Sequence, residues 1–94
     1  MKVPRLYVDF NELIDHNLVL LSQSDYKTDT MGNSIQLYEG RIVSIYMDDT
    51  DEKGNPDNLL AEGIVIPNPL PNHIAKWCCQ INDKGIYHES MKGK

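Results

Sequence analysis

The chain has 94 residues, of which 40% are hydrophobic and 24% are charged, and its formal net charge is −5. This length suits a single domain over residues 1–94 and excludes a large multi-layer enzyme, while the composition matches neither a disordered chain nor a disulfide-rich scaffold. The acidic balance and the scattered basic residues before position 63 make nucleic acid an unlikely partner, since a duplex binder needs a continuous basic surface.

The first part of the chain is predicted to form short strands and one helical turn. Arg5–Val8 is a weak strand candidate. Asp9 and Glu12 have the spacing of a capping box, in which two side chains bond free N–H groups at a helix start, so a helical turn is expected over Phe10–Ile14. Leu18–Ser22 is apolar and follows turn residues, which indicates a buried strand.

The middle of the chain carries the strongest β pattern. Residues 23–34 are polar and are predicted to form a long loop. In Arg41–Met47 the apolar residues alternate, so Val43, Ile45 and Met47 are expected to share the core face of a strand.

Another strand is expected at Leu59–Ile66, with Gly63 as a bulge or a point where two backbones approach closely. Prolines then interrupt any further pairing, because proline lacks an N–H donor and fixes φ. These prolines are Pro67, Pro69 and Pro71.

The last strands are predicted to form a hairpin. Ala75–Ile81 and Gly85–Glu89 flank the tetrad Asn82–Gly85, which suits a type I turn followed by a left-handed glycine. In the expected register, Ile81 faces Tyr87.

Five or six short strands and no amphipathic helix indicate an all-β fold. We expect a small, partly open barrel with one short helical turn near the N-terminus, since closure of the sheet removes exposed strand edges. In strand number and loop lengths this arrangement resembles an SH3-like barrel. No family motif accompanies the resemblance, so it assigns no functional residue.

The loop between the two central strands is the first candidate site. Residues 48–57 read DDTDEKGNPD, and their alternating carboxylates imitate the opening of a calcium-binding loop. Lys53 stands where an oxygen ligand is needed, and Leu60 stands where a bidentate carboxylate should close the site, so calcium is disfavoured. A solvated hairpin loop explains the charge run. An acidic contact site for a basic protein is the functional alternative.

The adjacent cysteines Cys78 and Cys79 are the second candidate. Neighbouring cysteines cannot adopt ordinary disulfide geometry, so we expect reduced thiols. The predicted hairpin places Cys78 and His88 on one face, where a redox-sensitive thiol or a metal site would be alternatives. Successive strand residues point to opposite faces, so both cysteines cannot bind one zinc ion, even if His16 or His73 completed the ligand set.

The aromatic residues are the third candidate. Tyr46 lies off the expected core face of its strand, and Tyr26 lies in the predicted polar loop. Such tyrosines either cap the open ends of a small core or line a peptide-binding groove. A lower-ranked interpretation joins Tyr46, Trp77 and the C-terminal lysines in a single-stranded nucleic-acid surface.

The favoured hypothesis is a non-catalytic protein-interaction module whose acidic face steers a basic partner. A metal- or small-ligand-binding domain, using the 48–57 loop or the face of Cys78 and His88, is the alternative. No nucleophile, base and orienting group stand together, so we expect no enzyme, no metal residue and no cofactor. We expect a cytoplasmic monomer or weak dimer without a membrane span. The expected partner-binding residues are Tyr26, Glu39, Tyr46, Asp48, Asp49, Asp51 and Glu52.

Overall fold

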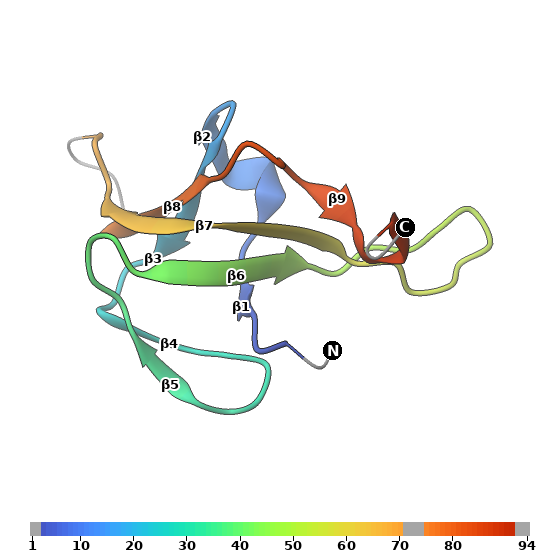
Figure 1. Ribbon diagram of the computed structural model, residues 1–94, viewed down its shortest axis with the longest axis horizontal. Coiled ribbons are helices and arrows are strands. Elements are labelled where there is room, and N and C mark those ends of the chain that lie inside the picture. The colour runs from blue at the N-terminus through green and yellow to red at the C-terminus, as the bar shows by residue number, and fades with distance from the viewer. Residues whose placement is uncertain (1–2, 71–74, 92–94) are drawn as a thin grey trace.

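The computed structural model describes residues 3–70 and 75–91, and nearly all of their regular structure is β (Figure 1). Pro71 and His73 lie outside the described residues. Two 3-10 turns, η1 (Phe10–Glu12) and η2 (Glu89–Met91), are the helical segments. Within this described part, no helix has the length and apolar character that crossing a bilayer requires. The strands are β1 (Leu6–Tyr7), β2 (Leu13–Asp15), β3 (Leu18–Ser22), β4 (Tyr26–Thr28), β5 (Ser34–Gln36), β6 (Ile42–Met47), β7 (Leu59–Pro67), β8 (Trp77–Ile81) and β9 (Tyr87–His88).

One curled sheet forms most of the molecule. Its strand order is β1-β6-β7-β8-β3-β2, with β9 as a further partner of β7, while β4 and β5 form a separate two-stranded sheet. Strand β1 is parallel to β6, and the other pairs are antiparallel. The two edge strands, β1 and β2, are consecutive in the chain and are joined through η1. The sheet is therefore a half-barrel, and the expected all-β, partly open fold with one N-terminal helical turn is confirmed.

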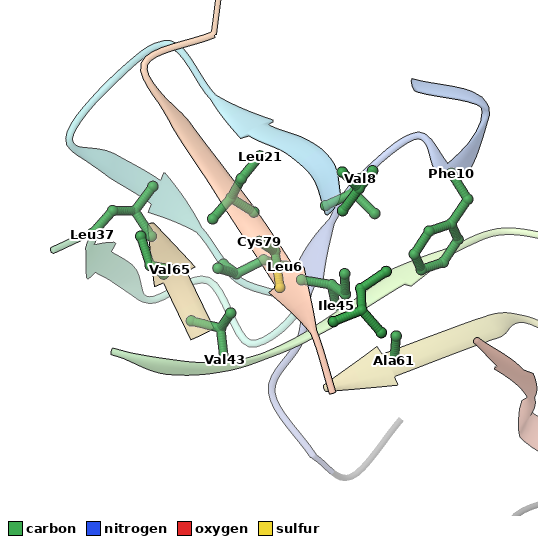
Figure 2. Close-up of a cluster of buried hydrophobic side chains, with 12 residues drawn as sticks. Leu6, Val8, Phe10, Leu21, Leu37, Val43, Ile45, Ala61, Val65 and Cys79 are labelled. Atoms are coloured by element: carbon green, nitrogen blue, oxygen red, sulfur yellow. The ribbon is translucent and has the colours of Figure 1, made fainter. Parts of the chain in front are cut away.

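The main core fills the concave side of this sheet (Figure 2). The alternation in β6 is confirmed, since Val43 and Ile45 are buried and Met47 packs against the same cluster, while Ile42 points the other way and is 79% exposed. Other core residues come from every long strand and from η1, which contributes Phe10. Burial of this apolar surface is the main stabilising contribution to folding.

A smaller apolar cluster lies on the convex side. It contains Leu18 and Leu20 of β3, Cys78 of β8, and Ala75. Strands β3 and β8 therefore bury side chains on both faces, which explains why Leu18–Ser22 reads as continuously apolar rather than alternating.

The N-terminal helical turn is shorter than expected. Asp9 caps it, with its Oδ1 accepting a hydrogen bond from the backbone N–H of Asn11 at 2.9 Å. The turn ends at Glu12 instead of Ile14, because Leu13–Asp15 pairs with β3 as strand β2. Backbone pairing to a neighbouring strand thus replaces the last turn that the sequence pattern suggested.

The expectation of a loop at residues 23–34 is wrong. Strands β4 and β5 pair there as a hairpin, with Lys27 opposite Ile35. Asp29 organises the connection: it is 8% exposed, and its Oδ1 accepts hydrogen bonds from the backbone N–H groups of Met31 and Asn33 at 2.8 and 2.9 Å. The strands are three residues long and mostly polar, so they lack an apolar alternation that sequence reading could detect.

The predicted C-terminal hairpin is also wrong, although its turn exists. The N–H of Gly85 donates to the carbonyl of Asn82 at 3.0 Å, and Gly85 has φ of 68°. The chain then continues along β7 instead of folding back on β8, so Tyr87 lies opposite Leu60 and Ile81 lies opposite Gly63. Strand β7 has nine residues, and β8 covers its C-terminal half, which leaves the other half for β9.

Candidate functional site

Residues 48–57 form an ordered extension of the β6–β7 ladder, which we call the acidic hairpin. The N–H of Asp57 donates to the carbonyl of Asp49 at 2.9 Å, Thr50 and Pro56 form a β-bridge, and the N–H of Asp51 donates to the carbonyl of Asn55 at 2.9 Å. In Figure 1 this segment projects at one end of the molecule's long axis. The acidic run is therefore held in one conformation almost to its tip.

The tip of the acidic hairpin depends on Asp51. Its Oδ1 accepts hydrogen bonds from the backbone N–H groups of Lys53 and Asn55, both at 2.9 Å. Gly54 adopts a φ of 82°, a left-handed conformation that favours glycine, and its N–H donates to the carbonyl of Asp51 at 3.0 Å. The Asp51 carboxylate thus stabilises the turn.

The base of the acidic hairpin holds the C-terminal segment. Asp57 accepts two hydrogen bonds from Ser90, one from its backbone N–H and one from its hydroxyl, both at 2.9 Å. The Nε2 of His88 lies 3.2 Å from Oδ2 of Asp49. The N–H of Glu89 donates to the carbonyl of Asn58, the residue before β7, at 2.8 Å. These contacts fix η2 beside the hairpin.

Charge is concentrated on this element. Its five carboxylates and one lysine leave a formal charge of −4 within ten residues. Asp48 and Glu52 are exposed and, among the residues that the structure describes, their carboxylates accept no hydrogen bond, in contrast to Asp51. Across residues 3–70 and 75–91, no three histidine, cysteine, aspartate or glutamate side chains gather in a way that would hold a metal ion. What the acidic hairpin offers chemically is a fixed negative surface.

The predicted partner-binding residues do not form one surface. Asp48, Asp49, Asp51 and Glu52 lie together on the acidic hairpin, as expected. Glu39 lies in the turn between β5 and β6, and Tyr26 begins β4; Figure 1 shows both segments toward the other end of the molecule. Glu39 and the acidic hairpin are close in the sequence, but the length of strand β6 separates them in the fold.

Tyr46 lies on the convex face of β6, near the base of the acidic hairpin. Its ring meets that of Tyr7 edge-on, with the centroids 5.5 Å apart. Burial, and after it the nearby charge of Asp48, raises the pKa of Tyr46. Trp77 packs against the core cluster on the concave side, so Tyr46 and Trp77 do not share a stacking surface. Lys92 and Lys94, which the sequence suggested as part of a single-stranded nucleic-acid surface, lie outside the described residues.

The expected face of Cys78 and His88 does not exist. Cys78 is fully buried in the convex cluster, whereas His88 lies beside the acidic hairpin, because β9 pairs with β7 and not with β8. Both cysteines are free thiols. Burial raises the pKa of Cys78, and burial with a smaller effect of its neighbour raises the pKa of Cys79 to about 12. Protonated, inaccessible thiols are poor nucleophiles and poor metal ligands.

The sequence did not predict the polar cluster formed by Arg5, Glu62 and Tyr87. Arg5 is 2% exposed, and its Nη1 donates to Oε2 of Glu62 at 2.9 Å. The hydroxyl of Tyr87 lies 3.0 and 2.9 Å from the two oxygens of the same carboxylate, and burial, followed by this hydrogen bond, raises the pKa of Tyr87. The available signal was Glu62 itself, a charge within the apolar run Leu59–Ile66.

Neither a known family model, nor a curated protein, nor a solved structure matches this chain.

Proposed function

We propose that the chain is a non-catalytic protein-interaction module whose acidic hairpin binds a basic segment of a partner protein. The observation that carries this proposal is the combination of order and exposure at residues 48–57. Backbone hydrogen bonds join Asp57 to Asp49 and Asp51 to Asn55. The carboxylates of Asp48 and Glu52 face solvent. An element with this combination can receive lysine or arginine side chains without first becoming ordered.

The rigidity of the hairpin has an energetic consequence. Ordering a loop on binding costs free energy, and an already ordered loop avoids most of that cost. Exposed ion pairs contribute little individually, about 0.2–1 kcal/mol each, so recognition by this surface must use several carboxylates together. We therefore expect weak, fast binding that depends strongly on salt.

The proposal can be tested with a fluorescent decalysine peptide, followed by anisotropy at about 20 mM and about 150 mM salt. The variant Asp48→Lys/Glu52→Lys reverses two exposed charges and leaves the bracing carboxylate of Asp51 intact. It should lower the affinity by about tenfold at low salt, since two reversed contacts change the binding free energy by roughly 1–2 kcal/mol.

The matched control is Glu39→Lys/Asp83→Lys, which produces the same net charge from exposed carboxylates outside the acidic hairpin. This control should lower the affinity less than threefold. Equal losses in the two variants would show that net charge alone attracts the peptide. An affinity that does not change with salt would also refute the proposal.

A further inference from the structure

A hollow on the convex face, separate from the acidic hairpin, contains the buried charge of Arg5. Its volume is about 560 Å³. Arg5 immediately precedes β1, and Ser44 of β6 pairs with Glu62 of β7, so these three residues occupy neighbouring strands. Tyr87 lies beside them, because β9 adds to the same part of β7. The sheet thus brings a cation, a carboxylate and two hydroxyls to one concavity.

The guanidinium of Arg5 is incompletely bonded. Its Nη1 donates to Glu62, but its Nε has no hydrogen-bond partner in the described part of the chain. A guanidinium has five N–H donors, and a buried charge is costly when its donors are not bonded. Tyr87 also donates to Glu62, and this shared carboxylate does not reach the Nε of Arg5. The paired planar donors of an arginine fit the two oxygens of a carboxylate or phosphate.

The remaining lining residues favour an anion attached to an apolar group. Lys84 contributes a second positive charge, so the lining holds two cations and one carboxylate although the whole chain has a net charge of −5. Val3 and Met91 supply apolar walls. Met91 ends η2, whose backbone is held by Ser90 at the base of the acidic hairpin, so the residue starts from a defined place beside the hollow.

We infer that this hollow is a binding site for an oxyanion, a carboxylate or a phosphate, carried on a small apolar group. The ligand's oxygens would meet the Arg5 guanidinium and the Lys84 ammonium, and its apolar part would lie against Val3 and Met91. The site lies outside the acidic hairpin, so it does not depend on the function proposed above.

The test is a titration of the ¹⁵N-labelled full chain with benzoate, phenyl phosphate and the neutral analogue benzamide. Saturable shifts are expected at the backbone amides of Ser44, Glu62 and Lys84 with benzoate or phenyl phosphate. A dissociation constant of about 1 mM is reasonable for ligands of this size. Whichever of benzoate and phenyl phosphate binds with the higher affinity shows whether the site prefers a carboxylate or a phosphate. Equal binding of benzamide would overturn the inference.

Two variants examine the cations. Lys84→Glu should weaken the binding of the anion at least fivefold, whereas Lys53→Glu, an exposed lysine on the acidic hairpin, should change it less than twofold. Arg5→Lys keeps the charge but removes the planar donor pair, and should weaken binding about tenfold. If Arg5→Lys does not fold, the comparison of the two lysine variants decides. Equal affinities in those two variants would refute the site.

Discussion

Gly63 lies so close to Gln80 that a side-chain carbon on the glycine would overlap the Gln80 carbonyl oxygen. The same carbon would come within 2.9 Å of Sγ of Cys79. Strands β7 and β8 are paired here, and Gly63 faces the main core beside Ala61 and Val65. The close approach anticipated from a glycine inside an apolar strand is thus confirmed. Glycine is needed at position 63 because the backbone of Gln80 lies directly beside it.

Gly63→Ala should destabilise the fold by about 2–3 kcal/mol, because the new carbon would meet backbone atoms that cannot rotate away. Gly32 provides the contrast: it has a φ of 84° but open space around it, so Gly32→Ala should cost about 1 kcal/mol through conformation alone. Urea unfolding followed by circular dichroism measures both. Equal costs would show that the β7–β8 approach is looser than described.

Glu62→Gln should destabilise the protein by about 2 kcal/mol, because it leaves the buried guanidinium of Arg5 without a compensating charge. Tyr87→Phe removes one hydrogen bond to the same carboxylate and should cost about 1 kcal/mol. Glu39→Gln, at an exposed turn, is the control and should change the unfolding free energy by less than about 0.5 kcal/mol. A neutral effect of Glu62→Gln would contradict the description of Arg5 as a desolvated charge.

The buried thiols should resist Ellman's reagent in the native state at pH 8 and react fully in urea. Their pKa values are raised in the fold, that of Cys79 to about 12, whereas an unfolded thiol ionises near the ordinary value of 9.0. The stability due to these thiols is therefore complete below pH 9 and declines as pH rises toward 12. Cys79→Ala should flatten this alkaline decline in unfolding experiments. Fast labelling of the folded chain would mean that β8 opens readily.

Asp25 should control the fluorescence of Trp77, the one tryptophan of the chain. The Oδ1 of Asp25 lies 2.7 Å from Nζ of Lys76 and accepts a hydrogen bond from Nε1 of Trp77 at 2.9 Å. The contact with Lys76 foremost, and then that with Trp77, lowers the pKa of Asp25 below its ordinary 3.8. The stabilising effect of the carboxylate is thus present above that value and is lost as pH falls through the lowered pKa. Native fluorescence should show a transition below pH 3.8 that Asp25→Asn abolishes. A transition retained in this variant would assign it to another group.

The sequence predicts best where burial imposes a pattern on many residues. Strand β6 alternates because one face lies on the core, and β3 is continuously apolar because both faces are covered. The pattern fails where polar atoms organise the backbone. Asp29 holds the β4–β5 hairpin through its side chain, and no periodicity in residues 23–34 reveals that role.

The sequence also did not predict which strand pairs with β9. The turn at Asn82–Gly85 is local, and its residues predict it correctly. Whether the next strand pairs with β8 or β7 depends on how much of β7 is already covered by β8. Strand β8 pairs only with residues 63–67 of β7, and this placement is known only from the assembled sheet. The same error produced the false face of Cys78 and His88. It also concealed the cluster that Tyr87 forms with Glu62.

The proposed function requires that residues 48–57 form an acidic hairpin that is ordered before it receives basic side chains. The most direct measurement is the titration of the ¹⁵N-labelled chain with decalysine, following every backbone amide. We expect the largest shifts at amides 48–57. The contacts between Asp49 and Asp57 and between Asp51 and Asn55 should already be present before peptide is added. Shifts of equal size around acids elsewhere, such as Glu39 and Asp83, or a hairpin that becomes ordered only with peptide, would contradict it.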